Sequence, residues 1–393
     1  MPWRSTCSMD EKEKFIAMWL AAGTQRCMSE LCRSFDISRK TGYKWIARYH
    51  RGGLPALVDR SHAPHHQRLA VPVGIERQIL GVRAKHPRWG PLKIEAWLTY
   101  RQPHTPWPAA STIGALLKRA GLTVPRRRRR QRACGTASLT PAGAANDVWA
   151  ADFKGWFRTG DGRRCDPLTI SDLQSRYLLR CQAVGTAQVE LVRPIFEATF
   201  RDYGLPAVIR TDNGTPFAGP SGLSRLAVWW IRLGIRPERI APGHPEQNGA
   251  HERMHRTLKA ETATPPRATL RAQQSAFDHF RRLYNHERPH AALGQTPPVT
   301  VYTTSARPYP ARLPAVEYPA TFVIRRTHAR GTIKWGGRRV FISEALAGEP
   351  VGVEEVADGQ WQLWFGPVKL GWIDARRPGS MQRTPRVLPI SSV

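Results

Sequence analysis

Residues 147–154 read Asp-Val-Trp-Ala-Ala-Asp-Phe-Lys, and the alternation within this stretch decides the fold of the middle of the chain. Trp149 and Phe153, followed by Phe157, occupy one face of a period-two pattern, and Asp152 occupies the other face. Alternation of this kind predicts a β-strand with a buried aromatic face. The strand is therefore expected to carry a carboxylate on the face that points away from its aromatic side chains.

The residues that follow predict the rest of a mixed α/β core. Apolar runs at 168–170 and 177–179 indicate two more strands, and residues 189–200 place apolar side chains at helical spacing. A fourth strand, at 207–209, leads to Asp212-Asn213-Gly214, a sequence typical of a tight turn. This order of elements predicts an α/β core over residues 146–300 with carboxylates at its rim.

Upstream of this core, two helical segments predict helix-turn-helix domains at residues 1–54 and 72–124. In the first segment, Ser38 is placed to cap a helix whose first turns would enter a DNA groove. The polar side chains expected to contact DNA there are Arg39, Lys40, Thr41 and Lys44. An ordinary basic helical bundle would show the same pattern, so the pattern alone leaves both interpretations open.

Two further segments complete the predicted organisation. Residues 125–145 form a basic linker, expected to lie along DNA phosphates through Arg126, Arg127, Arg128, Arg129 and Arg130. Short strand-like runs over residues 318–376 predict a small, barrel-like β domain. This domain would either bind DNA or pack between protomers, and its candidate cations are Arg325, Arg326, Lys334, Arg338 and Arg339.

The charge of the chain indicates the class of its partner. The 393 residues include 60 Lys and Arg against 30 Asp and Glu, a formal charge of +30. Such an excess favours a polyanion as partner, nucleic acid first. No stretch approaches the roughly 18 apolar residues of a membrane-spanning helix, and the N-terminus does not resemble a signal peptide. We therefore expect a cytoplasmic protein, associated with the nucleoid in a bacterium, that does not bind membranes.

Three carboxylates, Asp152, Asp212 and Glu252, are the candidate catalytic residues. Phosphodiester cleavage by two metal ions requires oxygen ligands that hold the ions about 4 Å apart. Glu252 is expected on a helix from 247 to 261 that packs through Ala250, Met254 and Leu258. The open face of that helix would then carry Glu252 together with three candidate DNA contacts, His255, Arg256 and Lys259. Taken singly, Glu252 could be a surface ion-pair partner of Arg256, and Asp212 a turn former.

The local contexts of these residues resemble a known family. They are Trp149-x-x-Asp152-Phe153, Thr211-Asp212-Asn213-Gly214, Asn248-Gly249-x-x-Glu252-Arg253 and Tyr284-Asn285-x-x-Arg288-Pro289-His290. In order and spacing they resemble the insertion-sequence transposases, whose catalytic core is similar to that of retroviral integrases. The resemblance extends through residues 29–45 and 89–93, and so covers most of the chain.

The resemblance implies a multidomain α+β protein with helix-turn-helix modules and an RNase H-like core. It implies a DDE triad of Asp152, Asp212 and Glu252 that binds Mg²⁺ or Mn²⁺, with two ions per active site. Family members bind the terminal inverted repeats of their element, expose 3′-hydroxyls by hydrolysis and join them to target DNA, working at least as dimers. Two departures stand out: no zinc-binding N-terminal domain is present, and Glu246 occupies a position where glutamine or another polar residue is commoner.

Two other functions compete with this interpretation. A decayed transposase copy would bind inverted repeats without cutting them and act as a repressor. Residues 251–255 also match H-E-x-x-H, the zinc-protease signature, in which His251 and His255 would hold zinc and Glu252 would be the base. The charged Arg253, the expected lack of burial of both histidines and the basic charge of the chain argue against a protease.

Overall fold

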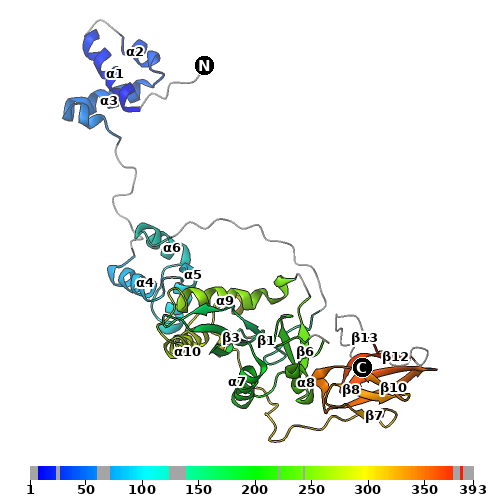
Figure 1. The fold of residues 1–393 in the computed structure, drawn as a ribbon. Helices are drawn as coiled ribbons and strands as arrows, with labels where there is room; N and C mark the ends of the chain where they lie inside the picture. The colour runs from blue at the N-terminus through cyan, green and yellow to red at the C-terminus, as the bar shows by residue number, and fades with distance from the viewer. Residues whose placement is uncertain are drawn as a thin grey trace. The chain divides into compact units, whose positions relative to one another are not determined.

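The structure is a computed structural model that describes residues 8–23, 27–59, 71–123, 139–219, 222–241, 244–374 and 381–383. The chain divides into two compact units, Met1–Val71 and Pro72–Val393, whose elements are shown in Figure 1. The arginine run at 126–130 lies outside the described residues. Among the helices that are described, none is both long and apolar enough to span a bilayer.

The N-terminal unit is helical, as the sequence predicts. Its helices are α1 (Ser8–Ala22), α2 (Met28–Ser34) and α3 (Arg39–Gly52), followed by a 3-10 turn, Leu54–Leu57. Phe15 lies at the centre of their core, with its ring edge-on to Phe35 and Trp45. Ser38 caps α3 as expected, because its side chain accepts a hydrogen bond from the Thr41 backbone N–H at 3.2 Å.

A glycine sets the packing of α3 on α2. A Cβ at Gly42 would lie 2.6 Å from the sulfur of Cys32, so only glycine permits this approach. Gly42 and Ile46 therefore face the core, while Tyr43 is exposed.

The second unit begins with another group of three helices, α4 (Val73–Lys85), α5 (Pro91–Arg101) and α6 (Ala110–Arg119). Ile79, Ile94 and Ile113 form its fully buried centre. This helical module contacts the region after α10 (Leu270–His286): Lys85 and Arg101 lie 3.9 and 3.6 Å from the carboxylate of Glu287. Lys93 also donates a hydrogen bond to the carbonyl of Pro289. The module is thereby attached to the α/β core.

A mixed sheet forms that core. Its strands are β1 (Val148–Phe153), β2 (Phe157–Arg158), β3 (Arg164–Asp172), β4 (Leu178–Val184), β5 (Val208–Thr211) and β6 (Arg236–Arg239). They run in the order β2-β3-β1-β5-β6, with β4 also paired to β3. The β1–β3 and β3–β4 pairs are antiparallel, whereas β1–β5 and β5–β6 are parallel. Phe157 belongs to a separate short strand and does not extend the alternation of β1.

Helices cover both faces of this sheet (Figure 1). On one face, α7 (Val189–Tyr203) and α8 (Arg225–Arg232) pack on Trp149, Leu168 and Ile170. On the other face, α9 (Gly249–Thr262) and α10 pack on β3 and β4 through residues that include Met254 and Phe277. Asp152 alternates with Trp149 and Ala151 along β1, so it faces α9.

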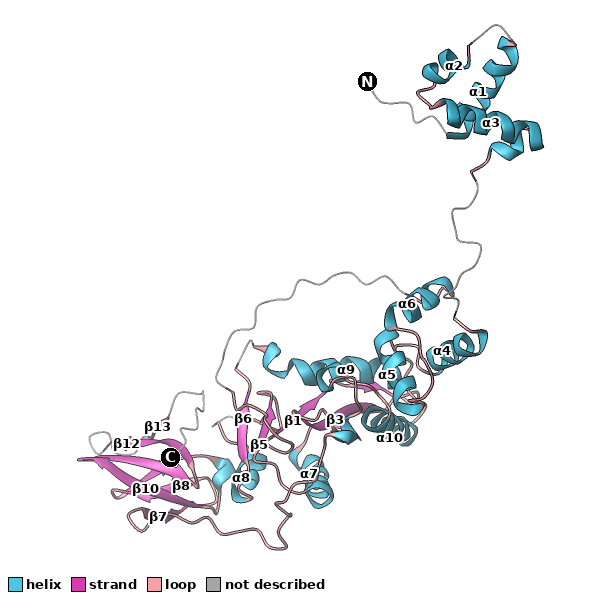
Figure 2. Cartoon of the chain, turned by 180° about the vertical axis from the view of Figure 1, so that it is seen from behind, coloured by secondary structure: helices cyan, strands magenta, loops and turns pink. Residues whose placement is uncertain are grey.

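The C-terminal strands form two sheets, which Figure 2 shows in magenta. Their bounds are β7 (Val323–Arg326), β8 (Thr332–Trp335), β9 (Arg338–Phe341), β10 (Pro350–Ala357), β11 (Gln360–Phe365), β12 (Val368–Asp374) and β13 (Met381–Arg383). One sheet runs β13-β12-β11-β10-β7, and β8 pairs only with β9 among the described strands. The expected barrel-like closure is therefore corrected to an open five-stranded sheet with a separate hairpin.

Helix α8 belongs to two hydrophobic cores. Leu226, Trp229 and Trp230 pack with the central sheet. Val228 and Ile231 pack with the C-terminal strands. A helix that is apolar all round is expected to be buried on all sides, and α8 fills the space between the two domains.

The substitution Ile231→Ala is expected to loosen the C-terminal sheet. Ile231 is buried against the turn at Gly366, and truncation of such a side chain costs about 2–5 kcal/mol. We expect faster amide hydrogen exchange in peptides from β10 to β12, measured by mass spectrometry. Leu191→Ala is the control, because Leu191 on α7 is 47% exposed. Unchanged exchange in Ile231→Ala would show that α8 does not support the C-terminal sheet.

Candidate active site

The parallel pairing of β1 with β5 brings two of the three candidate carboxylates together. Ala151 is the register partner of Thr211. The next residues along the two strands are Asp152 and Asp212. Because parallel strands end at the same edge of a sheet, both aspartates lie at one edge of the core. The charge of Asp212 raises the pKa of Asp152, which agrees with this placement.

The environment of Asp152 disfavours its charged form. Burial is the largest cause, and the negative charges of Asp212 and Glu252 act in the same direction, so the pKa of Asp152 rises from 3.8 to about 7. Lys154 and a hydrogen bond from the Phe153 backbone oppose this rise. The three carboxylates therefore lie near enough for their charges to interact. Among the described residues, the potential ligand atoms that gather within 4.8 Å of one another are those of Asp152, His251 and His255.

Asp212 is held by the turn that follows β5. Its Oδ1 accepts a hydrogen bond from the Gly214 N–H at 3.1 Å, and the Asn213 side chain donates to the carbonyl of Ile240 at 2.9 Å. Burial raises the pKa of Asp212, while the hydrogen bond from Gly214 lowers it. The turn thus orients the Asp212 carboxylate, and this structural function is compatible with a candidate catalytic role.

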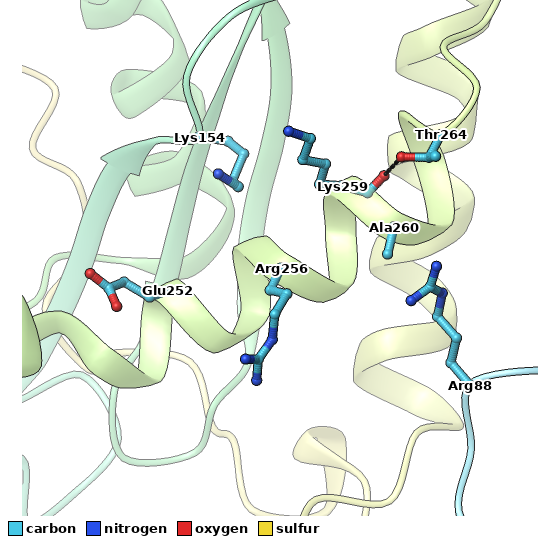
Figure 3. Close-up of a pocket in the computed structure, with 7 residues that line it drawn as sticks. All are labelled: Arg88, Lys154, Glu252, Arg256, Lys259, Ala260 and Thr264. Atoms are coloured by element: carbon cyan, nitrogen blue, oxygen red, sulfur yellow. Dashed lines mark hydrogen bonds between the residues drawn. The ribbon is translucent and has the colours of Figure 1, made fainter. Parts of the chain in front are cut away.

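Glu252 is exposed on α9 and borders a pocket of about 350 Å³. The other residues that line the pocket are Arg88, Lys154, Arg256, Lys259, Ala260 and Thr264. Figure 3 shows the Glu252 carboxylate pointing away from the guanidinium of Arg256, and no ion pair joins these two side chains in the described structure. The surface ion-pair interpretation of Glu252 is therefore not what the structure shows. One acid beside four cations suits a site for an anionic polymer.

The packed face of α9 differs from the face that the sequence predicts. Ala250 is exposed, and the buried positions are His251, Met254, His255, Leu258 and Thr262. The prediction that His255 lies on the open face and contacts DNA is corrected by this burial. The physical reason is that hydroxyl groups on β3 satisfy the imidazoles, so polar side chains can occupy core-facing positions.

The two imidazoles converge on one hydroxyl. Thr169 Oγ1 lies 2.7 Å from His251 Nε2 and 2.6 Å from His255 Nε2. Ser171 Oγ lies 2.9 Å from His251 Nδ1. Both histidines are thus buried, contrary to the expectation used against a zinc protease. The protease arrangement is absent from this helix for another reason, because both Nε2 atoms contact Thr169 in the core and do not face an open metal site.

The residues predicted to contact DNA fall into three groups. Arg39, Lys40 and Lys44 are exposed on α3, and the Thr41 hydroxyl lies 2.9 Å from that of Ser38. Arg256 and Lys259 are exposed on α9 and line the pocket beside Glu252. The arginines at 126–130 lie outside the described residues.

Sequence reasoning missed two residues that hold the site together. The Asn285 side chain accepts from the N–H of Leu178 at 2.8 Å and donates to its carbonyl at 3.0 Å, which joins α10 to the edge of β4. Thr169 is the register partner of Asp152 and donates to the Asp152 carbonyl at 3.1 Å. Asn285 belongs to the motif Tyr284-Asn285-x-x-Arg288-Pro289-His290, whereas Thr169 has no distinguishing feature in the sequence beyond its place in an apolar run.

Models of known protein families match most of the chain. An integrase core domain matches residues 142–245, and a second integrase core model matches 233–298. A helix-turn-helix domain matches 11–65 and a homeodomain-like domain matches 41–117. The IS481 family transposase C-terminal domain matches 322–380. The order of these matches agrees with the order of the elements in the structure.

Two curated relatives are insertion-element proteins. The chain is 29% identical over 229 residues to an uncharacterized protein of IS476 from Xanthomonas euvesicatoria, covering 57% of this chain and 63% of that protein. It is 30% identical over 189 residues to an uncharacterized protein of IS407 from Burkholderia multivorans, covering 47% and 66%. The chain thus spans slightly less than two thirds of each relative.

Solved structures of viral integrases are also similar. The catalytic core domain of HTLV-2 integrase, solved with magnesium, is 15% identical and has a TM-score of 0.33, covering 42% of this chain and 100% of that one. An integrase chain of the simian T-cell lymphotropic virus intasome, solved with a PP2A regulatory subunit, is 16% identical with a TM-score of 0.37, covering 73% and 96%.

In the metal-free protein, Asp152→Asn is expected to stabilise the fold more at pH 8 than at pH 5. The pKa of Asp152 is 3.8 before folding and about 7 in the folded state. The folded state therefore holds more protons between these values, and the wild type loses stability as the pH rises through this window. The amide avoids the loss, so its stabilising effect should be about 2–3 kcal/mol larger at pH 8.

Urea unfolding with a chelator present, followed by tryptophan fluorescence at both pH values, measures this difference. Asp278→Asn serves as the control, because Asp278 is exposed on α10. A stabilisation by Asp152→Asn that is equal at pH 5 and pH 8 would contradict the expectation.

Proposed function

We propose, since integrase core and IS481 transposase domain models match the chain, that it cleaves DNA at the ends of an insertion element and joins the 3′-ends to target DNA. The observation that supports this proposal is the position of Asp152 and Asp212 at one sheet edge, with Glu252 on α9 close enough to raise the pKa of Asp152 and beside a cationic pocket. Hard oxygen donors next to cations suit metal-dependent chemistry on a phosphodiester.

The donor set fits Mg²⁺ or Mn²⁺, with two ions per active site held by Asp152, Asp212 and Glu252. When bound, the ions would activate the attacking oxygen and stabilise the leaving oxygen. Asp152 must give up the proton that its environment favours before it serves as a ligand. Asp212 is already oriented by the Gly214 N–H, while Glu252 approaches from α9.

The cationic residues would hold the DNA. Arg256 and Lys259 follow Glu252 by one and two turns of α9 and would contact phosphates next to the reacting bond. Arg39, Lys40, Thr41 and Lys44 would read the inverted repeat, with the arginines at 126–130 along the intervening backbone. His255 is withdrawn from this set because it is buried.

Self-association to at least a dimer follows from the proposed reaction. Two element ends must reach one target duplex, and each active site has a single set of the three carboxylates. The double-stranded partners are therefore the terminal inverted repeats and the target DNA.

Asp152→Asn, Asp212→Asn and Glu252→Gln are each expected to reduce strand cleavage and strand transfer by at least about 100-fold while DNA binding is retained. Loss of one metal ligand removes charge stabilisation of several kcal/mol from the transition state. Labelled element-end DNA with Mg²⁺ or Mn²⁺ provides the cleavage assay, and a gel shift with Ca²⁺ or chelator measures binding. Asp278→Asn is the matched control and should remain active.

Two outcomes would overturn the proposal. Binding without cleavage by the wild type would favour a repressor derived from a transposase. Full activity in any of the three carboxylate variants would remove that residue from the proposed triad.

Lys40→Ala and Lys44→Ala are each expected to weaken binding to the inverted repeat and to make it less dependent on salt. Each lost phosphate contact should reduce the slope of log affinity against log salt by about 0.9. Fluorescence anisotropy over a series of salt concentrations measures this slope. Lys14→Ala is the control, because Lys14 on α1 pairs with Glu11. Equal slopes in all variants would argue that α3 does not contact DNA.

A further inference from the structure

Asp152, His251 and His255 form a cluster whose ligand atoms all lie within 4.8 Å of one another. Both imidazoles are buried between α9 and β3, and the Asp152 side chain is 17% exposed. Such a cluster has the composition of a metal site, but its hydrogen bonds decide which of the nitrogen atoms are free to bind an ion.

The hydroxyl of Thr169 fixes both imidazole tautomers. It has one proton, and that proton goes to the Asp152 carbonyl, which can only accept. The same oxygen must therefore accept from the two Nε2 atoms, those of His251 and His255, so both nitrogens carry hydrogen. His251 Nδ1 then accepts from Ser171 Oγ. Both nitrogens of His251 are thus occupied.

One imidazole nitrogen is left without such a partner. His255 Nδ1 faces Asp152 Oδ2 at 3.7 Å, too far for a hydrogen bond. Because His255 Nε2 carries the hydrogen that Thr169 accepts, Nδ1 is the nitrogen with the lone pair in the neutral ring. When Asp152 is ionised, two electron-rich atoms face each other in a mostly buried space. A cation between the two atoms would relieve this repulsion.

We propose that His255 Nδ1 is a further ligand of the metal ion bound by Asp152, giving this ion a mixed nitrogen and oxygen site. The inference rests on the proposed function, which supplies the ion. Two ligand atoms 3.7 Å apart can both coordinate one ion with bonds of about 2.0–2.2 Å.

The surroundings of His255 fit this role. An imidazole that binds a metal through one nitrogen almost always donates its other N–H to a fixed partner, which sets the ring orientation. Thr169 is that partner, and it also holds the Asp152 backbone. Imidazole nitrogen suits first-row transition metals such as Fe, Ni and Zn, whereas Mg²⁺ prefers oxygen. Of the two ions in the proposed function, Mn²⁺ is the transition metal, so this site should tolerate Mn²⁺ better than Mg²⁺.

Electron spin echo spectroscopy of Mn²⁺ bound to the full chain tests the proposal without any assay of activity. A directly bound imidazole produces a nitrogen hyperfine coupling in the echo modulation. We expect this coupling in the wild type, its loss in His255→Asn and its retention in His251→Asn. His251 is the matched control because it lies one turn away on α9 and is equally buried.

Calorimetric titration supplies a second measurement. His255→Asn should weaken Mn²⁺ binding at least about 10-fold, the lower range for loss of a group that supports a metal site. Its effect on Mg²⁺ binding should be smaller. Circular dichroism of both variants checks that α9 still folds. If a variant does not fold, the spin echo spectrum of the wild type still tests the proposal.

The outcomes separate this inference from the proposed function. A wild-type spectrum without nitrogen coupling would overturn the role of His255, as would a coupling that disappears with His251 instead. Cleavage that depends on the three carboxylates would stand in either case. Conversely, nitrogen coupling in a protein that cleaves no DNA would support the metal site and overturn the proposed reaction.

Discussion

The parallel pairing of β1 with β5 is the constraint on which the rest of the site depends. The Ala151–Thr211 register places Asp152 and Asp212 side by side although 59 residues of α/β structure separate them in the chain. A shift of one residue would turn one carboxylate toward the aromatic core formed by Trp149 and α7. Packing of that core therefore keeps the charges together on the opposite face, against their mutual repulsion.

Much of this arrangement could be predicted because apolar periodicity was strong. The alternation at Trp149 and Phe153, the helical spacing of 189–200 and the cap at Ser38 all correspond to observed elements. Each of these patterns is local, so it can be recognised without knowing which segments pack against it. The predicted roles of the three carboxylates came from resemblance, since each residue considered alone also fitted an ordinary structural explanation.

The features that were missed either lack a local signal or depend on partners that lie far away in sequence. Strand β6 contains Pro237 and shows little alternation of apolar and polar residues. It lies at the edge of the sheet, where a proline, which has no backbone N–H, is tolerated. His251 and His255 were assigned by polarity, but Thr169, more than 80 residues away, makes their burial favourable. Barrel closure likewise depends on which strands meet, and strand length and composition do not specify it.

Helix α8 connects the cores of two domains that are separate in the sequence. Residues 301–322 connect the central sheet to the C-terminal sheet. From the order of segments alone, a domain boundary would be placed at this point. A chimera joined there would exchange the strands but retain the old α8, whose Val228 and Ile231 are shaped to the lost partner. Exchange of the C-terminal domain between related proteins would therefore require matched changes in α8.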